Sequence, residues 1–205
     1  MQSRPERVAR TAPLAGLLLG SIDFVWIKYV PYPLGDLGNS SAIWALAAFV
    51  FAYWVRSGWL WSTVGAVGAL VIAVPSYYLA AALIQGDDLS VLWAPTSIVW
   101  MCFGILAGLV FGTAGTWARE HGWRPVVGVA LPGAVLFAEA MLLVRLTGHP
   151  DYGAEPPVLA ATRAVLGVLV VVLASRTNRQ RLLAMATAVP LALAGFGAFL
   201  AAGFR

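Results

Sequence analysis

Three ionisable residues lie deep inside apolar stretches of this 205-residue chain: Asp23, Glu139 and Arg163. A charge at the centre of a bilayer costs about 2.5–3.5 kcal/mol on insertion scales, so such residues usually face the protein interior and serve a function. A carboxyl group in a water-poor site tends to stay protonated and can then act as a general acid. The three residues predict acid chemistry inside a membrane, with Asp23 or Glu139 as the acid and Arg163 setting the charge state of Glu139.

Aromatic and small polar residues accompany these groups. Aromatic faces stabilise cations by roughly 0.5–2 kcal/mol each. Together with an acid, they suit the protonation of an alkene or epoxide and the stabilisation of the resulting carbocation. Helical spacing would put Trp93 and Trp100 on one face of their helix. We expect the substrate to be bound by Asn39, Ser40, Trp44, Tyr77, Tyr78, Trp93 and Trp100.

The composition indicates the elements that must position these residues. Sixty per cent of the residues are apolar and only 11% are charged, whereas about a quarter of the residues in a soluble domain are charged. Roughly 20 apolar residues cross a bilayer as a helix, and lipid leaves helices or closed barrels as the only spanning structures. We predict an all-α polytopic helix bundle, forming a single transmembrane domain over residues 1–205. Its seven expected spans are 12–31, 40–56, 60–84, 91–117, 125–146, 157–175 and 182–202.

Basic residues predict the orientation, because cytoplasmic loops are rich in Lys and Arg. With a cytoplasmic N-terminus, three basic residues fall outside, Arg163 lies within a span, and nine arginines fall inside: Arg4, Arg7, Arg10, Arg56, Arg119, Arg124, Arg176, Arg179 and Arg181. The candidate residues then lie in the middle or outer half of their spans. We therefore expect a multi-pass plasma-membrane protein with one polar, aromatic-lined pocket in its outer half.

Other features limit the function classes. The basic residues are scattered between apolar runs, which argues against a nucleic-acid partner and favours the lipid bilayer. Cys102 is the only cysteine, and His121 and His149 lie far apart, so we predict no protein-built metal site and no cofactor. Glycines spaced four apart indicate close helix contacts. They are Gly16 and Gly20 in one span and Gly104, Gly108 and Gly112 in another.

Each candidate also has a plainer interpretation. Glu139 and Arg163 could form only an interhelical ion pair that fixes register. Asp23 could snorkel or pair with Lys28. The aromatic side chains could serve packing alone. The two polar residues before Ser41 could do no more than cap the following helix.

Short motifs carry a resemblance to known proteins. They are the stretch from Asn39 to Trp44, the pair Tyr77 and Tyr78, the region of Trp100, and Phe137-Ala-Glu139. In these motifs the chain resembles a family of small actinobacterial integral membrane proteins. In size and span number it is also similar to small membrane-bound terpene cyclases, including those that cyclise prenylated indoles. This resemblance implies an isomerase or lyase that cyclises a lipophilic prenylated substrate.

The remaining sequence features bear on how such a reaction would start. Asp87 and Asp88 are followed by Leu89, Ser90 and Val91, which is not an Asp-Asp-x-x-Asp motif. Ionisation of a diphosphate through magnesium is therefore disfavoured against initiation by protonation. Two other classes stay open. One is a small proton-coupled carrier with Asp23 and Glu139 as relay groups, and the other is a structural assembly subunit that binds a partner through its glycine faces.

Overall fold

The computed structural model describes residues 4–149 and 155–204, and every regular element in them is helical, as the sequence predicts. The chain forms two compact units, one up to Thr116 and one from Trp117 onward. The prediction of a single transmembrane domain stays a prediction. The first unit holds α1 (Arg4–Tyr29), the short 3-10 helix η1 (Gly35–Leu37), α2 (Ser41–Val55), α3 (Trp59–Gln85), the 3-10 helix η2 (Leu89–Trp93) and α4 (Pro95–Trp117). The second holds α5 (Arg124–Arg145), α6 (Glu155–Ala174) and α7 (Asn178–Ala201).

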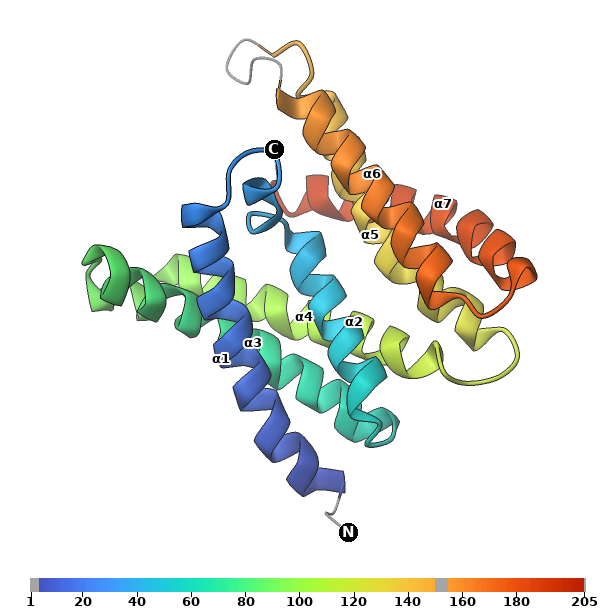
Figure 1. Ribbon diagram of the computed structural model, residues 1–205, viewed down its shortest axis with the longest axis horizontal. Coiled ribbons are helices and arrows are strands. Elements are labelled where there is room, and N and C mark those ends of the chain that lie inside the picture. Colours follow the sequence, from blue (N-terminus) through green and yellow to red (C-terminus); the bar gives the residue numbers. More distant parts are fainter. Residues whose placement is uncertain (1–3, 150–154, 205) are drawn as a thin grey trace. The chain divides into compact units, whose positions relative to one another are not determined.

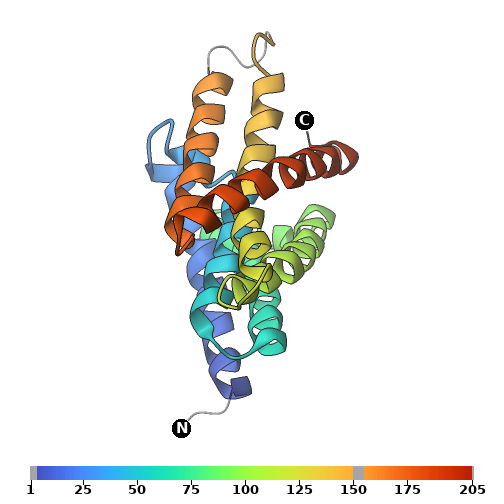
Figure 2. The ribbon, with the colours of Figure 1, turned by 90° about the vertical axis from the view of Figure 1, so that its right-hand side faces the viewer.

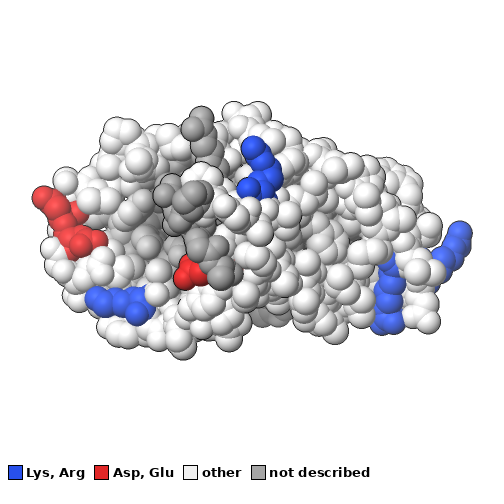
Figure 3. Space-filling view, turned by 90° about the horizontal axis from the view of Figure 1, so that it is seen from above, with Lys and Arg blue, Asp and Glu red and all other residues white. Residues whose placement is uncertain are grey.

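Six of the seven α-helices in the described residues, all except α2, are long and apolar enough to cross a membrane. Large apolar side chains such as Leu83, Leu106 and Leu173 are exposed, as expected for surfaces that face lipid. On the face drawn in Figure 3, charged side chains are few and isolated among uncharged atoms. The protein is a polytopic membrane helix bundle.

The second predicted span is shorter than the sequence indicates. Its helix, α2, has 15 residues, which corresponds to about 22 Å at ~1.5 Å per residue. The hydrocarbon core is about 30 Å thick, so α2 alone does not cross it. The expected helix over 40–56 is therefore corrected to a helix that covers only part of the bilayer.

The directions of α1 and α3 show that the chain must nevertheless recross the membrane between them. Gly65 near the start of α3 packs against Val8 near the start of α1, and Gly20 later in α1 packs against the Ala73 carbonyl later in α3. The two helices therefore run in the same direction (Figure 1). Since both are long enough to span, the chain between them must return across the core. We call residues 30–40 the connecting segment. Together with α2, which is too short to cross the hydrocarbon core alone, this segment brings the chain back across the membrane.

The connecting segment contains η1, is otherwise irregular backbone, and lies beside α1. A methyl group on Gly38 would collide with the Ile27 side chain and lie 3.2 Å from the Asp23 Oδ1 atom. Gly38 thus reaches the level of Asp23, well before the end of α1. Irregular backbone at membrane depth is tolerated only where protein covers it or where it lines a cavity.

Hydrogen bonds hold the connecting segment in place. Four consecutive N–H groups, from Leu37 to Ser40, donate to carbonyls three residues earlier, at N–O distances of 3.1–3.2 Å. The Trp26 Nε1 atom donates to the Leu34 carbonyl at 2.8 Å. Because these bonds satisfy backbone groups that lipid cannot, the segment can stay unwound next to α1.

The predicted glycine faces of α1 and α4 are confirmed as close helix contacts, and both faces pack against α3. Gly16 and Gly20 of α1 approach its backbone, and Gly108 of α4 lies against the backbone of Val67. The contacts of α4 run in the opposite direction along α3, because Gly104 meets Leu70 while Gly112 meets Ala66 and Thr63. The small residues are therefore used inside the first unit.

Gly20 offers a direct test of this packing. A methyl group there would overlap the Ala73 carbonyl and lie 2.7 Å from the Tyr77 backbone nitrogen. Gly20→Ala should therefore lower the free energy of unfolding by about 1–3 kcal/mol or more, since backbone cannot move aside as a flexible side chain can. The matched control is Gly68→Ala, whose methyl would lie 4.0 Å from the Ala12 Cβ atom. It should be neutral or stabilising by at most ~1 kcal/mol. Thermal unfolding in detergent compares them, and equal midpoints would contradict the packing.

The second unit is an up-down-up arrangement. Gly133 of α5 packs against Val171 of α6, while Gly167 packs against Phe137, so these two helices are antiparallel. The Gln180 side chain at the start of α7 donates to the Pro125 carbonyl at the start of α5. Figure 2 shows α5 and α6 side by side and α7 crossing them at an angle.

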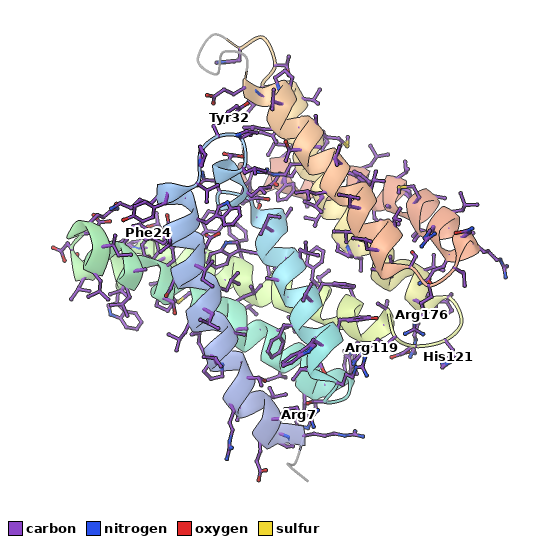
Figure 4. All side chains as sticks on the ribbon, in the orientation of Figure 1. Arg7, Phe24, Tyr32, Arg119, His121 and Arg176 are labelled. Carbon is purple, nitrogen blue, oxygen red and sulfur yellow. The ribbon has the colours of Figure 1, made fainter. Side chains whose placement is uncertain are left out.

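Arginines gather at one end of each unit. In the first, the Arg7 guanidinium donates to the Val55 carbonyl at 3.4 Å, at the end opposite Tyr32 (Figure 4). In the second, Arg119 and Arg176 mark the end where the α4–α5 and α6–α7 loops lie (Figure 4). Each unit therefore carries the charge asymmetry on which the predicted orientation rests.

Candidate functional site

The first unit contains a cavity of about 260 Å³ between α1, the connecting segment, the start of α2, α3 and α4. We call it the Asp23 cavity. Seven residues that the sequence singles out line it: Asp23, Asn39, Ser40, Trp44, Tyr77, Tyr78 and Trp100. They come from four helices and from the unwound backbone before α2. The structure brings these residues together.

Asp23 is the acidic residue of the cavity. It is 8% exposed, and its Oδ2 atom accepts a hydrogen bond from the Trp44 indole nitrogen at 3.1 Å. The alternative pairing with Lys28 is not found. The Lys28 ammonium instead lies 3.5 Å from the Gln85 amide oxygen and over the ring of Phe24. Within 4–149 and 155–204, no Lys or Arg forms an ion pair with Asp23.

Aromatic rings form much of the remaining wall. Tyr77 makes edge-to-face contacts with Phe24, at a centroid distance of 5.5 Å, and with Tyr78, at 5.3 Å. Trp100 packs against Phe103 at 5.8 Å. Such edge contacts fix ring orientation, so the aromatic wall is held in place by the protein rather than by a ligand.

The two small polar residues predicted at the site, Ser40 and Asn39, have different surroundings. The Ser40 hydroxyl accepts from the Ile43 backbone N–H at 3.3 Å, so Ser40 is the N-cap of α2, as the plainer interpretation holds. It also lines the cavity. Asn39 is exposed at the same rim.

The position predicted for Trp93, on the same helical face as Trp100, is wrong. Trp93 is 74% exposed and does not line the Asp23 cavity. The sequence places Trp93 and Trp100 on one helical face, but α4 begins only at Pro95. Trp93 ends the 3-10 helix η2, whose shorter repeat breaks the α-helical register.

Glu139 and Arg163 form the ion pair that the plainer interpretation describes. The Arg163 Nε atom lies 2.8 Å from the Glu139 Oε2 atom, and the two residues are 8% and 2% exposed. Both belong to the second unit, and neither lines the Asp23 cavity. The two candidate acids thus have different surroundings: Glu139 has a guanidinium partner, and Asp23 has an indole.

Comparison with known proteins places the chain in a family. Residues 2–203 match a family of unknown function, DUF6518. The chain belongs to this family. No curated protein and no solved structure matches it. None of these comparisons shows a similarity to membrane-bound terpene cyclases.

The acidic pair of this DUF6518 member lies outside the Asp23 cavity. The Asp88 Oδ1 atom accepts from the Ser90 backbone N–H at 2.7 Å and caps η2. The backbone and side-chain hydrogen bonds from Ser90 hold the pKa of Asp88 below its usual range. Asp87 accepts from the Gln85 amide at 3.0 Å. Both carboxylates organise the loop between α3 and α4.

Sequence reasoning missed seven residues of the wall, all of them apolar except Gly38 and Ser41: Ile27, Gly38, Ser41, Leu70, Val74, Phe103 and Ala107. Gly38 had a usable signal, since a glycine directly before a polar N-cap pair marks unwound backbone. The apolar residues had none, because their side chains look the same whether they face lipid or a cavity.

Proposed function

We propose that this DUF6518 member is a membrane-embedded terpene cyclase, with the Asp23 cavity as its active site and Asp23 as the acid. The substrate class is a lipophilic prenylated molecule, including prenylated indoles. The observation that carries the proposal is a buried carboxyl group in an aromatic-lined cavity, with no cation beside it in the described residues. Its second oxygen, Oδ1, accepts no hydrogen bond from those residues.

The proposed reaction is an isomerisation, because the substrate gains one proton and later loses one. The Asp23 O–H proton transfers to one carbon of an alkene, whose π electrons form the new C–H bond and leave a cation on the neighbouring carbon. A second alkene attacks this cation and closes a ring. The ring cation then loses a proton to the Asp23 carboxylate, which restores the acid. The rings of Trp44, Tyr77, Tyr78 and Trp100 stabilise the cation during these steps.

The packing of the first unit closes the cavity on one side, which supports its use as a reaction chamber. Below the cavity, towards the arginine-bearing end, apolar side chains fill the space between α1, α2 and α3. This cluster consists of Val8, Ala12, Ala48, Phe51, Ala52, Val55, Ala66 and Leu70. It separates the cavity from that end of the unit. A carbocation needs such exclusion, because water would capture it before cyclisation.

Of the two candidate acids, Asp23 fits the role better. Glu139 forms an ion pair with Arg163, whose guanidinium is always charged. A carboxylate in such a pair has no proton to donate to a substrate. In this proposal the Glu139–Arg163 pair stabilises the second unit. We place the protein in the plasma membrane with a cytoplasmic N-terminus, on the basis of its arginine ends.

The direct test is incubation of membranes that contain the protein with linear prenylated substrates, both terpenes and prenylated indoles. Mass spectrometry and chromatography should detect a cyclised product of unchanged mass, because the net reaction adds and removes one proton. Membranes from cells that lack the protein are the control. The absence of any new isomer across the substrate panel would count against the cyclase.

A carrier function has one observation in its favour. Transporters often bind their substrates where a spanning helix is interrupted, and the connecting segment interrupts the return between α1 and α3. The apolar cluster below the cavity closes the path, which favours a site with one entrance. Proteoliposome flux that depends on Asp23 would favour the carrier. The assembly-subunit alternative loses its basis, because the glycine faces are occupied by α3.

A further inference from the structure

We infer that the Asp23 cavity is a binding site for a compact organic ammonium ion, a tertiary or quaternary amine with apolar substituents. The inference rests on the proposed function in assigning Asp23 and the surrounding rings to one ligand. It deepens that function because it names a stable class of molecules that the cavity recognises without any reaction.

The charge of the cavity wall points to a positive ligand. Asp23 is the acidic residue of the wall, and among the described residues no Lys, Arg or His lines the cavity with it. The nearest basic residue along α1, Lys28, is engaged by Gln85 and by aromatic rings. A buried carboxylate is normally paired with a cation or a metal. The structure supplies no such partner from the described residues, so the ligand can supply it.

The rest of the wall selects an organic cation over a metal ion. Calcium takes six to eight oxygen ligands and magnesium six, and both prefer carboxylates and carbonyls. Here one carboxylate shares the wall with the rings of Trp44, Tyr77, Tyr78 and Trp100, and the other polar side chains of the wall are the neutral groups of Asn39, Ser40 and Ser41. Aromatic faces around a carboxylate are the surroundings that quaternary ammonium groups prefer, because each ring face attracts the charge and its methyl groups pack against the rings.

The size of the cavity limits the ligand. Its volume of about 260 Å³ lies just below the range of ~300–1,000 Å³ that small-molecule sites usually have. A single-ring ammonium compound is therefore a suitable probe. Benzyltrimethylammonium has a neutral counterpart of nearly the same shape, neopentylbenzene, in which carbon replaces the nitrogen. Comparing the two isolates the contribution of the charge.

Isothermal titration calorimetry on the purified full-length protein in detergent tests the inference. The wild-type protein should bind benzyltrimethylammonium at least tenfold more tightly than neopentylbenzene. Asp23→Asn should remove that preference while leaving the affinity for neopentylbenzene within about twofold. The control Asp87→Asn changes a carboxylate outside the cavity and should bind as the wild type does.

A second variant keeps the test valid if Asp23→Asn does not fold. Trp100 lines the cavity and is 42% exposed, so Trp100→Leu should fold and should weaken ammonium binding several-fold without weakening the neutral probe equally. Equal affinities of the two probes for the wild type, or no binding of either, would overturn the inference. A charge preference with no cyclised product contradicts the cyclase alone. A cyclised product with no charge preference contradicts this inference alone.

Discussion

Replacing Asp23 by asparagine should lower the rate of product formation by about 10²–10⁴-fold, which is the usual contribution of a positioned general acid. Asparagine keeps the size of the side chain, and its amide oxygen can still accept from the Trp44 indole, which now donates to Asp23 over 3.1 Å. It has no acidic proton to give. The loss should therefore appear in the rate at saturating substrate, measured as cyclised product per folded protein in membranes.

The matched control for this prediction is Asp87→Asn. It makes the same chemical change in a carboxylate that binds the Gln85 amide in the loop after α3. Its rate should stay within about twofold of the wild type. If Asp23→Asn retains wild-type activity while a cyclised product is formed, then Asp23 is not the acid and the mechanism proposed here is wrong.

Breaking the Glu139–Arg163 pair should destabilise the protein by about 3–5 kcal/mol, because removing one partner leaves the other charge buried and uncompensated. The pair joins α5 to α6 across 2.8 Å, and the Arg163 side chain is only 2% exposed. We expect this loss for both Glu139→Gln and Arg163→Met, measured as the free energy of unfolding in detergent. The double variant Glu139→Leu/Arg163→Met should lose less than the sum of the single losses, since no charge is then left alone.

An exposed ion pair in the same unit provides the comparison. Arg124 and Glu120 pair near the start of α5, with side chains 50% and 35% exposed. Glu120→Gln should lower the free energy of unfolding by only about 0.3–0.5 kcal/mol, because water screens such pairs.

Measurements of activity distinguish a structural role of Glu139 from a catalytic one. If it is structural, the folded fraction of Glu139→Gln should retain wild-type turnover, and a loss of turnover in fully folded protein would show that the second unit takes part in catalysis.

Hydropathy was sufficient to predict most of the helices from the sequence. Continuous apolar runs can exist in lipid only as helices, since every backbone group must be satisfied within the segment. The predicted close contacts at Gly16, Gly20, Gly104, Gly108 and Gly112 also held, because in lipid only small residues let backbones approach. The buried position of Asp23, Glu139 and Arg163 followed from the cost of a charge in hydrocarbon.

The sequence by itself thus determined that the protein is a polytopic helix bundle and which residues turn away from lipid. Only the tertiary structure decided that α2 is short, that the connecting segment reaches Asp23, and that Trp93 falls outside the cavity. It also decided the partners of the two acids: Trp44 for Asp23 and Arg163 for Glu139. The reason is physical. A hydropathy pattern reports depth along the membrane normal, whereas a site depends on which helices are neighbours within the membrane plane, and that is set by packing.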